Sequence, residues 1–330
     1  MQHKRNDSMF HVEQKGDGLG KTISVCNQKG GVGKTTTSIN LSAYLAAAGQ
    51  RVLIIDIDPQ ANTTSGIGVD KQAIKKSIYN VLIDNTPLGE VIIKTPVQNM
   101  FLAPADLHLT GAQIELVSAF NREQQLKNSI LPIKQDYDFI IIDCPPSLGL
   151  LTINALTASE TTLIPLQCEY YAMEGLSQLL HTIKLVQNNL NPVLDIEGVI
   201  LTMADYRTKL TNEVIGEARA FFKEKVYDTV IPRSIRLSEA PGHGKPVMLY
   251  DKDSNGAEAY KALAAEIINR NTLPPLELDD KQPDSDTITP QEHNDQDMQK
   301  DVDTHKVVPV ENGTAAIKII EEDGGDNGEA

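Results

Sequence analysis

Three glycines and two lysines are crowded into residues 29–36, KGGVGKTT, and this short stretch constrains the fold more than any other part of the chain. The run TISVC at residues 22–26 predicts a strand just before it, and residues 34–48 carry apolar side chains at helical spacing just after it. Glycines let backbone N–H groups approach an anion closely, and the first turn of a helix adds a favourable dipole. The pattern therefore predicts a phosphate-binding loop between a strand and a helix.

Alternating strand and helix patterns continue along the chain. The run FIIID at residues 139–143 is apolar on both of its faces, as expected for a strand that helices cover on both sides. We therefore predict an α/β fold, with a mostly parallel twisted sheet flanked by helices on both faces. The other predicted strands are 51–58, 99–103, 161–165 and 196–202, and amphipathic helices are predicted at 175–188 and 255–269.

Two residues of the loop have expected contacts with a nucleotide. Lys34 should reach its β- and γ-phosphates, and the hydroxyl of Thr35 should ligate Mg²⁺. The common spacing G-x-x-x-x-G-K-[ST] fails at its first glycine, because Gln28 occupies that position and a second lysine, Lys29, follows it. The alternative, a chance glycine loop with a solvated lysine, is disfavoured by the strand and helix on either side.

The charge of the chain is unevenly distributed. There are 30 Lys and Arg residues against 45 Asp and Glu, which gives a net charge of −15, and residues 271–330 alone hold 16 acidic and 4 basic residues. This stretch has few aliphatic residues and scattered prolines, so it buries too little apolar surface to offset the entropy of ordering. We expect a flexible extension at residues 1–20, one domain at 21–270 and a disordered acidic tail at 271–330.

Other classes of protein are disfavoured by what the sequence lacks. The first 20 residues contain no apolar stretch typical of a signal peptide, and no apolar run approaches the ~18 residues of a membrane span. Cys26, Cys144 and Cys168 are widely spaced and form no C-x-x-C pair, so neither a disulfide framework nor a zinc site is indicated. Reduced thiols in a cytoplasmic protein are the simplest interpretation, and no redox role is expected for Cys144.

Several sequence blocks together resemble the ParA/MinD superfamily, in which the KGGVGKTTT string is a deviant Walker A motif. The resemblance spans about residues 21–270 and is strongest to the chromosomal ParA proteins called Soj. It implies a P-loop NTPase fold of the SIMIBI type, ATPase activity, and ATP and Mg²⁺ as cofactors. The matching blocks are IDIDPQANTTSGIGV (55–69), IIIDCPPSLGLLTINAL (140–156), QCEYYAMEGLSQLL (167–180) and IPRSIRLSEAPGHGKPV (231–247).

By this resemblance, Lys29 is the signature lysine, which reaches across an ATP-bound homodimer to the phosphates of the partner subunit. A cation at the γ-phosphate offsets the charge that phosphoryl transfer must handle. Gly30 and Gly31 leave room for two chains to approach each other closely. The implied ATP-binding residues are Lys29, Gly30, Gly31, Val32, Gly33, Lys34, Thr35, Thr36 and, on the adenine side, Pro232 and Arg233.

Three aspartates at predicted strand ends complete the predicted catalytic site. Asp56 and Asp58 are two residues apart, so both side chains should point to the same face. The resemblance implies that Asp58 positions the attacking water and that Asp56 assists near Mg²⁺ or Lys29, although a turn role before Pro59 is the alternative, chiefly for Asp56. Asp143 fits a Walker B carboxylate that holds Mg²⁺ through water. The predicted catalytic residues are Lys29, Lys34 and Asp58, and the predicted metal site is Thr35, Asp56 and Asp143.

A locally basic stretch interrupts the acidic chain, since residues 207–245 hold eight basic and five acidic residues. Such a run is often only a solvated face. The resemblance implies that Arg207 and Arg236 bind non-specific DNA, and Lys223 and Lys245 are further candidates from the same stretch. Two such patches paired across a dimer would form one phosphate-binding surface, whose affinity falls steeply with salt.

The predicted function is a DNA-segregation ATPase for chromosome or plasmid partitioning. An ATP-bound dimer would sit on nucleoid DNA, and a ParB-like (Spo0J-like) partner would stimulate hydrolysis and release it. We expect a cytoplasmic, nucleoid-associated protein with no membrane partner. The main alternative is a MinD-like membrane-associated division-site ATPase, which should end in a basic amphipathic helix, whereas this chain ends EEDGGDNGEA. A tyrosine autokinase should carry a C-terminal tyrosine cluster, whereas the last tyrosine here is Tyr260. A nitrogenase-type iron–sulfur reductase should hold a cluster through paired cysteines, and Cys144 has no matching second ligand.

Overall fold

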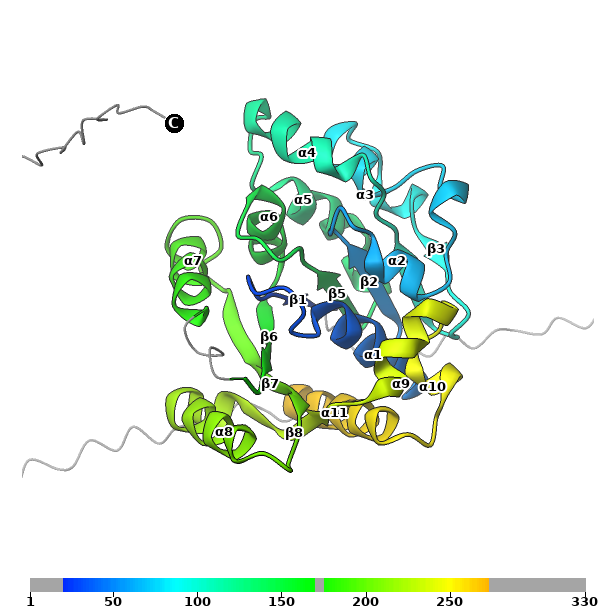
Figure 1. Cartoon of the computed structure of the whole chain (residues 1–330). Coiled ribbons are helices and arrows are strands. Elements are labelled where there is room, and N and C mark those ends of the chain that lie inside the picture. The colour runs from blue at the N-terminus through cyan, green and yellow to red at the C-terminus, as the bar shows by residue number, and fades with distance from the viewer. Residues whose placement is uncertain (1–19, 170–174, 273–330) are drawn as a thin grey trace, which may run out of the picture. The chain divides into compact units, whose positions relative to one another are not determined.

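The computed structural model describes residues 20–169 and 175–272 (Figure 1). The predictions for the N-terminal extension and for the acidic tail lie almost entirely outside these residues. Within the described residues, no helix is both long enough and apolar enough to cross a membrane.

A single sheet forms the centre of the fold. Its strands are β1 (Lys21–Val25), β2 (Val52–Asp56), β3 (Ile93–Lys94), β4 (Met100–Ala103), β5 (Phe139–Asp143), β6 (Thr161–Gln167), β7 (Asp195–Ala204) and β8 (Val226–Pro232). Within the described residues the strand order is β3-β4-β2-β5-β1-β6-β7-β8, and every neighbouring pair is parallel except β3 with β4. The strand that leads into the glycine loop, β1, thus lies between β5 and β6.

The helices connect these strands and cover the sheet. They are α1 (Lys34–Ala47), α2 (Asn62–Gly66), α3 (Ile78–Ile83), α4 (Leu109–Glu115), α5 (Gln125–Ile130), α6 (Leu150–Ala158), α7 (Leu176–Asn189), α8 (Lys209–Phe222), α9 (Ile235–Glu239), α10 (Val247–Tyr250) and α11 (Asn255–Thr272). Short 3₁₀ turns are η1 (Lys71–Ala73), η2 (Leu88–Glu90), η3 (Leu116–Ser118), η4 (Leu131–Asp136), η5 (Lys223–Lys225) and η6 (Ala240–His243).

Each face of the sheet has its own hydrophobic core. In β2, Leu53 and Ile55 belong to the core that also holds side chains of α3 to α8, whereas Val52 and Ile54 belong to the core shared with α1, α9, α10 and α11. Because successive side chains of a strand point to opposite faces, a strand covered on both sides must be apolar throughout. Every residue of β2 and β5 is buried accordingly.

The α/β architecture and the six predicted strands are confirmed, with strand ends shifted by one or two residues. The sequence pattern did not predict β3 or β8, which lie at the two edges of the sheet. An edge strand is solvated along one side, so its hydrophobic pattern is weak. In β8, for example, Asp228 is exposed, and the next two residues, Thr229 and Val230, are only partly buried.

Candidate functional site

The glycine loop between β1 and α1 adopts a backbone that most residues cannot reach. Gly31 has a φ of +75° and Gly33 a φ of +91°, which lie in the left-handed region where a side chain is unfavourable. A Cβ atom at Gly30 or Gly31 would meet nothing within 4 Å, so the outer face of the loop is open. On the inner side, the Thr202 hydroxyl donates to the Val32 carbonyl at 2.9 Å and ties the loop to β7.

Lys34 begins α1 and is almost completely buried, with 7% of its surface exposed. Its Nζ donates to the Lys29 carbonyl at 3.2 Å. Burial lowers the pKa of Lys34, although the nearby Asp143 carboxylate acts in the opposite direction. The Lys34 ammonium group is therefore held against the loop backbone. In its charged form it can bind an anion there.

Asp143 is hydrogen-bonded both to α1, the helix that follows the glycine loop, and to α2, the helix that follows β2. Its Oδ2 accepts hydrogen bonds from the hydroxyls of Thr35 at 2.9 Å and Thr63 at 2.7 Å. Its Oδ1 accepts one from the Ser38 hydroxyl at 2.9 Å. The carboxyl group is fully buried, and burial raises its pKa while these three hydrogen bonds lower it. Asp143 is thus brought next to Thr35, its predicted partner in the metal site.

Asp56 is the register neighbour of Asp143 in the adjacent strand. Its Oδ2 accepts hydrogen bonds from the Thr64 backbone N–H at 2.9 Å and from the Thr64 hydroxyl at 2.7 Å, and its Oδ1 accepts one from the Asp58 N–H at 3.2 Å. Burial and the charge of Asp143 raise its pKa to about 7. In this structure Asp56 therefore holds the turn into α2, and its predicted place near Mg²⁺ or Lys29 stays a prediction.

A cavity of about 280 Å³ opens above the glycine loop. Asp58 lines it, only 6% exposed, with one carboxylate oxygen accepting the Gln60 N–H at 2.9 Å. The lysine, hydroxyl and carboxylate predicted for phosphate chemistry thus face one space. Its lining residues are Gly30, Gly31, Gly33, Lys34, Thr35, Thr36, Asp58, Gln60, Asn62, Pro146 and Met203.

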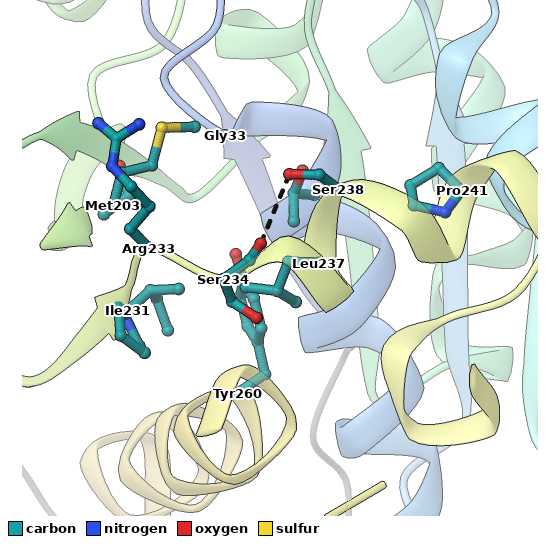
Figure 2. Close-up of a pocket in the computed structure, with 12 residues that line it drawn as sticks. Gly33, Met203, Ile231, Arg233, Ser234, Leu237, Ser238, Pro241 and Tyr260 are labelled. Atoms are coloured by element: carbon teal, nitrogen blue, oxygen red, sulfur yellow. Dashed lines mark hydrogen bonds between the residues drawn. The ribbon is translucent and has the colours of Figure 1, made fainter. Parts of the chain in front are cut away.

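A second cavity, of about 210 Å³, adjoins the first and shares Gly33, Thr36 and Met203 with it. Figure 2 shows its lining, which includes both residues predicted for adenine contacts, Pro232 and Arg233. The α11 residue Tyr260 lines it as well and is hydrogen-bonded to the Thr37 hydroxyl of α1 at 3.0 Å. The other lining residues are Thr202, Ile231, Ser234, Leu237, Ser238 and Pro241.

Lys29 is not among the described residues that line the phosphate-side cavity. Its Nζ lies 3.5 Å from Glu169 Oε2, at the end of β6, and Arg233 reaches the other oxygen of the same carboxylate at 3.7 Å. Lys29 instead lines another hollow of about 530 Å³ with Ser147, Gln178 and Pro146, of which Pro146 also borders the phosphate-side cavity. Within one subunit, the two lysines of the loop thus point into different spaces.

The mixture of oxygen donors suits Mg²⁺, which prefers carboxylates and hydroxyls and keeps several waters. Thr35 lines the phosphate-side cavity, and its Oγ1 lies 2.9 Å from Asp143 Oδ2. This arrangement fits a metal held by the Thr35 hydroxyl and, through water, by Asp143.

The four predicted DNA-binding residues are exposed but do not share one surface. Arg207 and Arg236 follow the carboxyl ends of the neighbouring strands β7 and β8, where Arg207 pairs with Asp205 at 2.6 Å and Arg236 with Glu239 at 2.8 Å and Asp251 at 3.1 Å. Lys245 follows η6, which packs against α2.

Lys223 stands apart from the other three. It follows α8, which runs back along the sheet, so it lies beside the amino end of β8, at the opposite edge from Arg236. The neighbouring Lys225 confirms this placement, because its Nζ pairs with Asp195 at the start of β7 at 2.7 Å.

Several residues that shape the site were not predicted from the sequence. Met203 lines both cavities and has a φ of +54°, a strained backbone for a residue with a side chain. Ser38 and Thr63 bond Asp143, and Glu169 bonds Lys29. Ser38 could be found from the sequence, since it lies one helical turn after Lys34. The approach of Met203, Thr63 and Glu169 to the site depends on the order of the strands in the sheet.

Comparisons with known proteins agree with this geometry. A family model described as an AAA domain matches residues 20–196. The chain is 58% identical to the sporulation initiation inhibitor protein Soj of Bacillus subtilis, over 76% of this chain and 98% of that protein. It is 49% identical to the chromosome-partitioning ATPase Soj of Treponema pallidum, over 77% of this chain and 99% of that protein. It also resembles the solved structure of cobyrinic acid a,c-diamide synthase from Mycobacterium smegmatis with bound ADP and magnesium, with 35% identity, a TM-score of 0.68, and coverage of 76% of this chain and 95% of that one.

Proposed function

Since this chain belongs to the Soj and ParA family of chromosome-partitioning proteins, we propose that it segregates DNA through an ATP-dependent cycle of dimerisation and DNA binding. The protein is an ATPase of the P-loop type, with ATP and Mg²⁺ as its cofactors. The finer steps of the cycle are our proposal and rest on the site described above.

The observation that carries the proposal is the separation of the two lysines. Lys34 faces the phosphate-side cavity of its own subunit, whereas Lys29 faces a different hollow and is paired with Glu169. A cation that is kept from its own nucleotide is available to the nucleotide of a second subunit. The open face at Gly30 and Gly31 leaves room for that approach. We therefore propose a homodimer that closes around two ATP molecules.

The residues around the cavity have distinct proposed tasks. Lys34 holds the β- and γ-phosphates from within the subunit, and Lys29 of the second subunit adds positive charge as the γ-phosphoryl group leaves. Asp58 orients the attacking water, because its carboxylate faces the same cavity and is fixed on one side by Gln60. When bound, Mg²⁺ neutralises charge on the phosphates. Pro232 and Arg233 enclose the base.

We propose that the dimer binds DNA without sequence preference, through Arg207 and Arg236, with Lys245 as a further contact. Both arginines emerge at the carboxyl edge of the sheet, the edge that also carries the nucleotide site. One subunit offers few phosphate contacts, so a paired surface gains much more affinity than a single one. Because ATP causes the dimer to form, the ATP-bound protein would associate with the nucleoid and the single subunit would bind DNA only weakly.

The cycle is tested by the ATPase rate of the full chain alone, with duplex DNA, with a purified ParB-like protein, and with both. The proposal expects little stimulation by either addition and at least about a tenfold increase with both. A rate that stays at the level of the protein alone under all four conditions would contradict partitioning. Co-sedimentation with anionic liposomes separates the membrane-associated MinD-like alternative, because ATP-dependent pelleting without DNA would favour it.

A further inference from the structure

Two cysteines, one of them directly after Asp143, lie in contact in the buried interior of the fold. The sulfur atoms of Cys26 and Cys144 are 3.1 Å apart and share a hydrogen bond. Both thiols are buried, with 1% and 0% of their surface exposed, and neither has a task in the nucleotide chemistry described above. They are 118 residues apart in sequence, so only the fold brings them together.

The sheet itself sets the distance between the two backbones. Val25 of β1 and Asp143 of β5 are register partners, and the Cys144 N–H continues the ladder by donating to the Val25 carbonyl at 3.4 Å. Cys26 and Cys144 are therefore the next residues across two parallel strands. Neighbouring strands lie about 4.8 Å apart, which falls within the range of Cα separations that a disulfide accepts. Bridging the pair therefore requires a local shift of the two side chains and their neighbours, not a different strand arrangement.

Against the expectation from the sequence that Cys144 has no redox role, we propose from this geometry that Cys26 and Cys144 form an oxidisable dithiol site, which small hydroperoxides convert to an intramolecular disulfide. In this step each sulfur loses its proton and one electron, and the S–S bond forms. The O–O bond of the hydroperoxide breaks, and the two electrons and two protons yield one alcohol and one water, or two waters from hydrogen peroxide. This inference goes beyond the proposed partitioning function and does not depend on it.

We infer that peroxide reaches the thiols from the side of the nucleotide site. Cys144 directly follows Asp143, which is hydrogen-bonded to Thr35, a residue that lines the phosphate-side cavity. The cavity of about 280 Å³ admits a peroxide molecule when no nucleotide fills it. Bound Mg²⁺ and ATP should therefore slow oxidation by blocking this route.

The disulfide would change the nucleotide site because each cysteine adjoins a residue that organises it. An S–S bond of about 2.05 Å requires the sulfurs to move together by about 1 Å. Asp143, directly before Cys144, holds three hydroxyls, and Asn27, directly after Cys26, accepts the Lys29 N–H at 3.0 Å and donates to the Pro165 carbonyl at 2.8 Å. Oxidation should thus weaken nucleotide binding and hydrolysis reversibly.

The test treats the nucleotide-free full chain with hydrogen peroxide, alkylates the remaining thiols and digests the protein without reduction. Mass spectrometry is expected to find a linked Cys26–Cys144 peptide as the main product, with ATPase activity reduced at least about tenfold and restored by dithiothreitol. Magnesium with a non-hydrolysable ATP analogue should slow formation of the linked peptide several-fold. Cys168, which has no sulfur neighbour among the described residues, serves as the internal control and should remain alkylated.

Single variants C26A and C144A should each form no linked peptide and lose activity to peroxide at least about fivefold more slowly than the parent chain. Where a variant fails to fold, as judged by its thermal melt, peptide mapping of the parent chain decides alone. The proposal is overturned if both thiols remain free while activity falls. It is equally overturned if oxidation of Cys168, or sulfinic acid on a single cysteine, accounts for the loss.

Discussion

Lys29 Nζ lies 3.5 Å from Glu169 Oε2 within one subunit, although Lys29 is the first residue of the phosphate-binding loop. Both side chains are partly exposed, at 37% and 44%, so this ion pair is weak and breaks readily. The weak pairing with Glu169 can hold Lys29 away from the nucleotide of its own subunit. It still leaves Lys29 able to contact the nucleotide of a second subunit. The pair therefore separates nucleotide binding, which needs Lys34, from the proposed dimerisation, which needs Lys29.

Replacing Lys29 tests this separation directly. The Lys29→Ala variant should bind ATP within about threefold of the parent chain, because Lys34 and the loop backbone remain. It should lose the ATP-dependent dimer, which analytical ultracentrifugation with a non-hydrolysable analogue would measure. Lys34→Ala is the matched control and should lose nucleotide binding itself. A stable dimer of Lys29→Ala would show that Lys29 does not act in the second subunit.

Replacing Glu169 should act in the opposite direction. In Glu169→Gln the side chain keeps its shape but no longer holds the Lys29 ammonium by charge. Exposed ion pairs contribute about 0.2–1 kcal/mol, so we expect dimerisation with ATP to tighten by about twofold to fivefold. The dimer dissociation constant, measured at several protein concentrations, is the readout. Weaker dimerisation would mean that Glu169 contributes to the dimer rather than restraining Lys29.

Asp58 should be needed for hydrolysis but not for binding. Asp58→Asn keeps an oxygen that can accept the Gln60 N–H and removes the negative charge facing the cavity. Loss of a group that orients or deprotonates an attacking water costs about 10²–10⁴ in rate. We expect kcat to fall by at least 10²-fold and ATP affinity to change little. Single-turnover hydrolysis measures both, and wild-type turnover would remove Asp58 from the proposed chemistry.

The DNA surface is tested by two charge reversals, one near the carboxyl end of β8 and one near its amino end. Arg236→Glu should weaken binding to duplex DNA at least about tenfold and lower the salt dependence by about one unit of slope. Lys223→Glu makes the same change at the amino edge, beside the start of β8, and should cost less than about threefold. Fluorescence anisotropy at several salt concentrations compares them. Equal losses would place the DNA surface elsewhere.

A partly buried ion pair near the amino ends of β1 and β7 gives a prediction on stability. Glu197 accepts the Lys21 ammonium at 2.6 Å, the Thr161 hydroxyl at 2.6 Å and the Asn271 amide at 3.0 Å. Burial alone would raise the pKa of Glu197, but the charge of Lys21 and these hydrogen bonds lower it below its usual value. The ionised group therefore stabilises the fold at and above its ordinary pKa of about 4.3, and this stability is lost as the pH falls through the lower folded-state value.

Glu197→Gln should thus reduce the free energy of unfolding at pH 7 by about 1–3 kcal/mol. The reduction should be smaller at pH 3, which lies below the ordinary pKa of about 4.3, so that the unfolded chain already binds the proton. Urea unfolding at both pH values measures the difference. Glu90→Gln is the control, because Glu90 pairs with Lys76 at 2.6 Å on the exposed surface and should matter by less than about 1 kcal/mol. An equal loss at both pH values would contradict ionic stabilisation by Glu197.

The local sequence was sufficient to predict the elements that are buried on both faces. Continuous apolar runs predicted β2 and β5, and the glycine spacing predicted the loop between β1 and α1, because burial and backbone freedom act on neighbouring residues. The edge strands β3 and β8 were not predicted, since half-solvated strands carry little hydrophobic pattern.

The tertiary structure decided which of these elements meet. Strand order places β5 between β1 and β2, which sets Asp143 against Asp56 and Cys144 against Cys26. It places the end of β6 beside the loop, so that Glu169 meets Lys29 across 140 residues of sequence. Sequence periodicity records which face of an element is buried, but not which distant element covers it. That choice depends on crossover connections and on packing over the whole sheet, so the partners of each site residue appear only in the fold.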